Sequence, residues 1–147
     1  MNDKDNEGLI DVSSVNQLSK EQFEELSAGR SVTDTLVATT GNFKGEVTYS
    51  HWWGGSGTVF YCYTSQYRIT RLNGQQGGNK ANLNFFFDSL QSWSSRSPDA
   101  MWQDGAWHSY ARGGWIGANK QARFFAEFVF DKSGDDPKAS SQKRYSF

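Results

Sequence analysis

The amino-acid sequence predicts an all-β, mainly antiparallel protein: a β-sandwich with a short N-terminal helix and a long tryptophan-rich loop segment. Aromatic residues make up 16% of the 147-residue chain, which suits a compact aromatic core. The chain contains fifteen glycines and only two prolines, which indicates many tight turns. From about residue 32, apolar residues recur with a period of two, the spacing of half-buried strands.

This period predicts the individual strands. They are expected at residues 32–38, 43–53, 58–64, 67–72, 82–88 and 121–131. The last is the clearest, because alternate residues form one apolar face: Ala122, Phe124, Ala126, Phe128 and Phe130. This pattern predicts a half-buried antiparallel strand with an aromatic inner face. Asn73-Gly74 is a strong turn signal.

The two ends of the chain differ from this body. Residues 1–30 form an acidic leader, of which residues 1–10 are expected to be disordered. Ser19 and Gln22 then have the spacing of a capping box, which predicts a short helix ending at Gly29. Its thin apolar stripe favours docking on the body over membrane insertion. Residues 31–132 are expected to form the sandwich, and residues 133–147 a polar tail that frays.

Charge and cysteine content exclude several classes of protein. The formal net charge is −1, which gives no overall electrostatic attraction for nucleic acid. The single cysteine, Cys62, allows no intramolecular disulfide and is interpreted as a buried strand residue rather than a reactive thiol. No signal-peptide core or membrane-spanning run is present. We expect a soluble protein that is made in the cytosol. If it is exported, we expect a non-classical route.

Catalytic motifs are not evident. His51 and His108 each adjoin a tryptophan, and a distant aspartate with a serine would be needed to complete a triad. The chain has no Gly-x-Ser-x-Gly elbow, no His-Glu-x-x-His and no phosphate-binding glycine loop. We therefore expect a non-enzymatic protein without cofactor or metal, and keep a His-dependent hydrolase as an alternative.

The tryptophans carry the functional prediction. All six lie between residues 51 and 115, many beside glycine or serine. Such rings can be core residues, stack on sugars, or lie at a lipid interface, while base stacking is less favoured. Trp52 and Trp53 continue a strand and are partly core, whereas residues 89–119 show little periodicity. The candidate ligand-binding residues lie in that segment: Trp93, Trp102, Asp104, Trp107, His108, Tyr110, Arg112 and Trp115.

Three short segments also suggest a family. Asp104–Tyr110 is similar to a Gly-Trp-His segment of sea-anemone cytolysins. Residues 118–129 and Gly54–Thr58 are similar to segments of fungal fruit-body lectins. The C-terminal third thus resembles the actinoporin-like superfamily, which implies a β-sandwich flanked by short helices. It also implies a loop surface for a glycan or phospholipid headgroup, with Tyr110 on that surface and Trp107 and His108 beside it.

The sequence therefore predicts a recognition module. Exposed tryptophan and tyrosine rings are expected to bind glycans, or glycosylated or zwitterionic membrane surfaces, peripherally. Because one stacked ring binds weakly, we expect a homodimer or a higher homo-oligomer. The alternative on the same scaffold is a membrane-lytic, pore-forming cytolysin, although the cytolysins' apolar N-terminal helix is replaced here by an acidic leader.

Overall fold

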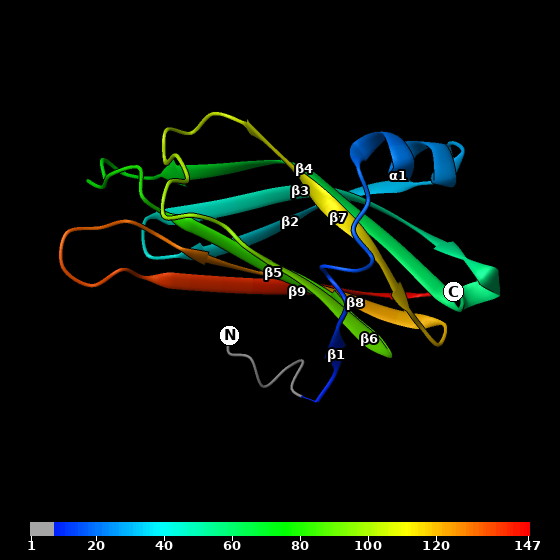
Figure 1. Ribbon diagram of the computed structural model, residues 1–147. Helices are drawn as coiled ribbons and strands as arrows, with labels where there is room; N and C mark the ends of the chain where they lie inside the picture. Colours follow the sequence, from blue (N-terminus) through cyan, green and yellow to red (C-terminus); the bar gives the residue numbers. More distant parts are fainter. Residues whose placement is uncertain (1–7) are drawn as a thin grey trace.

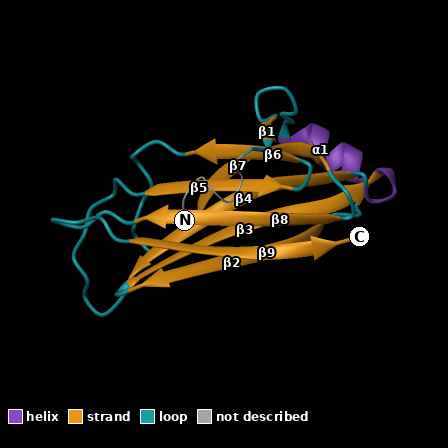
Figure 2. Ribbon diagram, turned by 90° about the horizontal axis from the view of Figure 1, so that it is seen from below, coloured by secondary structure: helices purple, strands orange, loops and turns teal. Residues whose placement is uncertain are grey.

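The computed structural model describes residues 8–147 and shows two packed β-sheets (Figure 1). One sheet has five strands in the order β1 (Ile10–Asp11), β6 (Gln91–Arg96), β5 (Asn82–Asp88), β8 (Gln121–Val129) and β9 (Lys138–Ser146). The other has four in the order β2 (Val32–Thr40), β3 (Phe43–Gly54), β4 (Val59–Arg71) and β7 (His108–Gly117). Neighbouring strands are antiparallel except β1 and β6, and Figure 2 shows the two sheets face to face. The predicted all-β sandwich is confirmed.

The core forms where alternate residues of both sheets meet. The predicted inner face of residues 121–131 is confirmed, because all five of its apolar residues are buried. Phe124 stacks on Tyr49 of the opposite sheet with ring centroids 3.8 Å apart. On the outer face of β8, Arg123 is also buried and pairs with Asp88 at 2.7 Å. This strand is therefore more covered than its alternating pattern suggested.

The turn between β3 and β4 explains a glycine-rich segment. It contains the short 3-10 helix η2 (Gly55–Gly57), in which Gly55, Ser56 and Gly57 have φ angles of 55°, 54° and 90°. A residue with a Cβ atom adopts this left-handed conformation only at a cost in free energy, and here three successive residues adopt it. Glycine therefore occupies two of the three positions. The glycines therefore build a tight turn that ends one long hairpin.

Two expectations about irregular segments are wrong. The polar tail does not fray, because β9 pairs with β8 along its whole length. It is an edge strand with few buried side chains, so its apolar periodicity is faint. The long segment at residues 89–119 is not one loop, because it contains β6 and β7. Serines in β6 and three glycines in β7 hide the strand pattern.

The leader is part of the sandwich from residue 10 onward. After β1 pairs with β6, the chain crosses to β7, where Leu18 N–H donates to the Gly113 carbonyl at 3.0 Å and Trp115 N–H to the Asn16 carbonyl at 3.2 Å. This segment bridges the two edge strands on the open side of the sandwich (Figure 1). Gly114 permits the contact, because a Cβ there would lie 1.9 Å from the Asn16 carbonyl oxygen. The expected disorder of residues 1–10 is wrong for Ile10, which pairs with Gln91 in β1, and residues 1–7 lie outside the described residues.

Helix α1 (Lys20–Ser27) follows and docks on the four-stranded sheet. The capping box is confirmed: the Gln22 N–H donates to the Ser19 hydroxyl at 3.1 Å, and the Ser19 N–H to the Gln22 side chain at 2.9 Å. Phe23 packs against Trp52 and Tyr63 on the outer face of the sheet, whereas Leu26 is exposed. Docking of the helix on the body is thus confirmed, with Phe23 as its buried aromatic residue.

Within residues 8–147, no helix has the length and apolar character needed to cross a membrane.

Replacing Gly114 with Ala should detach the leader from β7. The added methyl group meets backbone rather than a movable side chain, so we expect a loss of about 1–3 kcal/mol in the free energy of unfolding. Urea unfolding measures this loss. Gly117→Ala is the matched control, because a Cβ there meets only the flexible Gln91 side chain, 3.1 Å away. Equal losses in both variants would contradict the explanation.

Candidate functional site

Aromatic side chains gather at the end of the sandwich where the loops at residues 72–81, 97–107 and 130–137 meet, at the left of Figure 1. Trp102 is 51% exposed and Trp107 is 37% exposed. His108 stacks on Trp102 at a centroid distance of 5.9 Å and on Tyr67 at 5.5 Å. We call Tyr67, Arg68, Trp102, Asp104, Trp107 and His108 the aromatic end.

An aspartate fixes the histidine of this end. The His108 Nε2 lies 2.9 and 3.0 Å from the two carboxylate oxygens of Asp104. The Ala106 N–H donates to the same carboxylate at 3.0 Å across a turn at Gly105. Although partial burial opposes it, these hydrogen bonds hold the pKa of the Asp104 carboxyl below its usual value. Asp104 is therefore a charged acceptor at neutral pH.

An arginine orders the second exposed indole. The Arg68 guanidinium lies 4.6 Å from the centre of the Trp107 ring. It is held by Glu46, with Nε to Oε1 at 2.8 Å and Nη2 to Oε2 at 3.3 Å. Because the guanidinium is planar and is held by two hydrogen bonds, it restricts the orientation of the Trp107 ring that it lies over. Trp107 is thus presented to solvent in a defined orientation.

Gln103 ties the three loops together. Its buried side-chain amide donates to the carbonyls of Gly78 and Asp131, both at 2.9 Å. Its carbonyl oxygen accepts from the Asp131 N–H at 2.9 Å, and its own N–H donates to the Asn79 side chain at 2.9 Å. Because it is buried, Gln103 has a structural role here. It places Trp102, its neighbour in the chain, against Tyr67, whose hydroxyl accepts the Trp102 N–H at 2.9 Å.

The structure brings together only half of the predicted ligand-binding residues. Trp102, Asp104, Trp107 and His108 lie at the aromatic end. The expectation of exposed rings at Trp93 and Tyr110 is wrong: they are 4% and 5% exposed and belong to the core.

Arg112 and Trp115 lie further along β7 and are both half-buried. Arg112 lies over the Tyr110 ring at 3.8 Å. Trp115 pairs across the strands with Tyr61. Neither residue therefore belongs to the aromatic end.

The second histidine belongs to a buried network at the other side of the sandwich. His51 Nε2 lies 2.9 Å from the Asp34 carboxylate, which also accepts from the Tyr145 hydroxyl at 2.6 Å. The Tyr145 hydroxyl lies 2.6 Å from that of Tyr49. The His51 ring packs on Tyr145 with centroids 4.0 Å apart. This network joins β2, β3 and β9, and so ties the two sheets together.

The remaining chemistry-bearing residues are also structural. Cys62 is fully buried, as predicted, and burial raises the pKa of its thiol well above the usual value. Trp53 packs against the core as predicted, while Trp52 lies on the outer face under α1. Among the described residues, no three His, Cys, Asp or Glu side chains form a group that would hold a metal ion.

No protein-family model, curated protein or solved structure matches the chain. The resemblance to the actinoporin-like superfamily therefore stays a prediction, and the argument for function depends on the geometry of the site.

Sequence reasoning missed the supports of the aromatic end. Tyr67 and Arg68 lie in a predicted strand, and their alternation with Ile69 was read only as a strand pattern. Glu46 occupies the position of β3 that pairs with Arg68. Opposite charges at paired positions of adjacent strands were the available signal, but it required the strand register.

The buried His51 network predicts a dependence of stability on pH. Burial lowers the pKa of His51 despite the opposing Asp34 charge. Below about pH 6.5 the unfolded chain binds a proton that the folded chain does not, so stability falls with falling pH. The hydrogen bond from Tyr145 lowers the pKa of Asp34, which adds a second loss at acid pH as that carboxylate is protonated.

Urea unfolding from about pH 3 to pH 8 tests this explanation. In His51→Gln, which keeps a donor for Asp34, the loss below about pH 6.5 should disappear; its slope is at most about 1.4 kcal/mol per pH unit. Tyr145→Phe should keep that loss and reduce the further loss below about pH 4, because the folded-state pKa of Asp34 then lies closer to its unfolded-state value. An unchanged slope in His51→Gln would assign the effect to other groups.

Proposed function

We propose that the chain is a non-enzymatic recognition module that binds glycans at the aromatic end. The observation that carries this proposal is the pair of exposed indoles, Trp102 and Trp107, beside one ordered histidine. An indole face stacks on the apolar face of a sugar ring, and adjacent charged groups bond its hydroxyls. Asp104 supplies acceptor oxygens and His108 a ring nitrogen, within the same surface.

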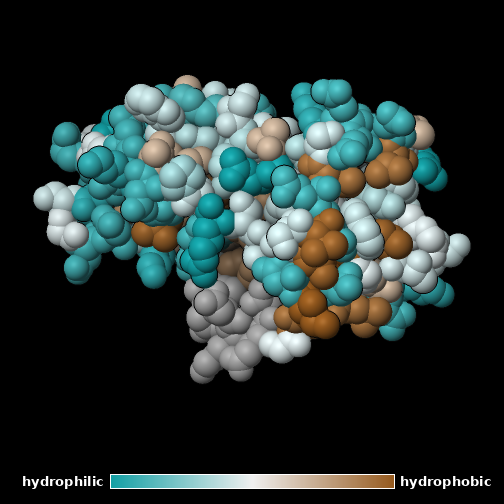
Figure 3. All heavy atoms as spheres, in the orientation of Figure 1, coloured by the Kyte–Doolittle hydropathy of each residue, from teal (hydrophilic) through white to brown (hydrophobic). Residues whose placement is uncertain are grey.

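The surroundings favour a sugar over a lipid at this end. Figure 3 shows mostly hydrophilic residues over the loops at the left of the molecule. The neighbouring loop at residues 73–80 has only polar, glycine and lysine residues. A ring that enters a bilayer needs an apolar surround to enter with it. The two indoles instead rise from a polar surface, which supports contact with a hydrated ligand.

A second candidate function is attachment to a membrane surface elsewhere on the molecule. Ile10, Val15 and Leu90 are 71%, 80% and 61% exposed. Figure 3 shows hydrophobic residues along the side that the leader covers, and this supports a peripheral contact there. Pore formation has less support, because Phe23 of α1 is already buried against the sheet.

A hydrolase has less support than a binding module. Each histidine ring packs between aromatic rings and is hydrogen-bonded to an aspartate, but within residues 8–147 no serine, threonine or cysteine side chain is hydrogen-bonded to either ring as a nucleophile would be. A homodimer that doubles the sites remains part of the proposal, because an open stacking surface gives weak affinity for a single sugar.

Replacing Trp102 or Trp107 with Ala should weaken glycan binding. A well-placed ring contributes about 1 kcal/mol beyond its buried area, so each variant should lose about fivefold in affinity. A glycan array with the full chain identifies the sugar, and titration calorimetry with that sugar measures the loss. Trp115→Ala is the matched control, since it removes a half-buried indole of β7 that lies outside the aromatic end.

Liposome leakage separates the lytic alternative. Binding to the array without dye release is the expected result, with thermal unfolding showing that each variant stays folded. A silent array, or equal losses from all three tryptophan variants, would contradict glycan binding at the aromatic end. Dye release would favour the cytolysin.

A further inference from the structure

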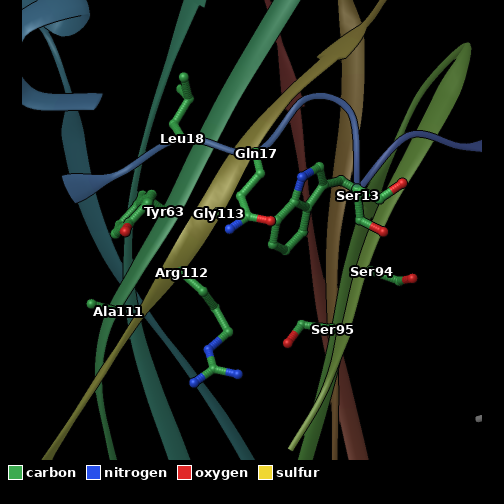
Figure 4. A pocket seen from close by; sticks show the side chains of 11 residues that line it. Ser13, Gln17, Leu18, Tyr63, Ser94, Ser95, Ala111, Arg112 and Gly113 are labelled. Atoms are coloured by element: carbon green, nitrogen blue, oxygen red, sulfur yellow. The ribbon is translucent and has the colours of Figure 1, made fainter. Parts of the chain in front are cut away.

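A cleft of about 440 Å³ opens between the leader, β6 and β7, away from the aromatic end. Figure 4 shows side chains from all three segments around it, among them Gln17, Ser95 and Arg112. The cleft exists because β6 and β7 belong to different sheets and do not pair with each other. Its lining is mostly polar, with Tyr63 and Trp93 as the large aromatic walls.

The arginine in this cleft differs from other arginines of the protein. Arg68 pairs with Glu46 and Arg123 with Asp88, but Arg112 forms no ion pair within residues 8–147. Its Nε is buried without a hydrogen-bond acceptor. A buried donor without a partner is uncommon, because it loses its bonds to water and gains none. Arg112 therefore carries an unused positive charge.

The position of that charge is fixed by aromatic rings. The guanidinium lies 3.8 Å from the centre of the Tyr110 ring, so its flat face is covered and its edge remains for a ligand. Tyr63 of β4 and Arg112 of β7 both line the cleft, so the guanidinium lies on the side formed by these two strands.

Neutral donors complete the lining. The hydroxyls of Ser13 and Ser94 already donate to the Asp11 carboxylate. These bonds use acceptor positions of the Asp11 carboxylate. Ser14 and Ser95 and the amide of Gln17 also line the cleft, from the leader and β6. The polar groups for a ligand thus come from several directions around Arg112.

We propose that this cleft binds a phosphate or sulfate group, held by the guanidinium of Arg112 with Ser95 and Gln17 as neutral donors. An arginine fork matches two oxygens of such a group, and its tetrahedral shape directs the others toward donors on different segments. A planar carboxylate would use the fork alone. The volume exceeds that of a single ion, so the cleft has room for the molecule that carries the group as an ester.

This site is separate from the proposed glycan surface. Arg112 is four residues from His108 along β7, a distance of about 13 Å in an extended strand. Ligand binding can therefore be followed independently at each site, since Trp93 lines the cleft whereas Trp102 and Trp107 lie at the aromatic end. Each tryptophan indole N–H gives its own signal in a nitrogen–proton NMR spectrum.

Titration of the full chain with inorganic phosphate and with sulfate, followed by NMR, tests the proposal. We expect saturable shifts of the Trp93 indole and the Arg112 Nε signals, while the Trp102 and Trp107 indoles stay unchanged. Arg112→Gln should weaken binding roughly tenfold to a hundredfold, and Arg112→Lys should keep part of it. Arg30→Gln is the matched control, because Arg30 lies over Trp52, 4.7 Å from its ring, outside the cleft.

The outcomes separate the two proposals. Equal weakening by Arg30→Gln, or shifts that never saturate, would indicate nonspecific screening and would overturn the site. Shifts of Trp102 and Trp107 alone would likewise overturn it, whereas failure of glycan binding would leave these signals unaffected. Two further titrations identify the molecule that carries the phosphate or sulfate group. Broadening of the Trp93 and Arg112 signals by phosphatidylserine vesicles assigns a lipid headgroup. Slower, saturable exchange with a sulfated disaccharide assigns a sulfated sugar.

Discussion

The open side of the sandwich imposes the constraint on which the rest depends. On one side β9 and β2 approach each other and are joined by the Asp34 network. On the other side, β6 and β7 would each be an edge strand without the leader, and backbone groups left without partners there would be costly. The leader satisfies part of each strand, because β1 pairs with the start of β6 and residues 16–18 bond to the middle of β7.

Several local features follow from this bridging segment. Gly114 carries no side chain because the leader backbone occupies the place of a Cβ. The chain then turns into α1, whose capping box starts the helix over the outer face of the four-stranded sheet. The same crossing leaves the cleft around Arg112, because the leader spans the two edges without filling the space between them. One backbone path therefore sets the helix, the glycine and the cleft.

Sequence reasoning reached the elements whose signal is local. The strand with Phe124 and Phe128 on one face, the Ser19 capping box and the burial of Cys62 follow from neighbours in the chain. β7 and β9 were not predicted. Glycines weaken the apolar periodicity of β7 and edge exposure weakens that of β9, although hydrogen bonds to strands distant in the sequence order both.

The candidate site was half predictable for the same reason. The weak periodicity of residues 89–119 marked Trp102 and Trp107 as candidates for exposed rings. The same reasoning failed for Trp93 and Tyr110, whose strands turn these rings toward the core. Which side of a strand faces inward depends on its register with partners, and a segment without clear alternation does not reveal this.

The hydrogen bonds of Gln103 have a consequence for the energetics of recognition. A loop that orders only when ligand arrives loses conformational entropy at that moment, and this opposes binding. Here one amide side chain fastens three loops to one another in the unliganded chain. The loops are ordered during folding, so a ligand at this end does not have to order them, and that entropic cost does not reduce its affinity.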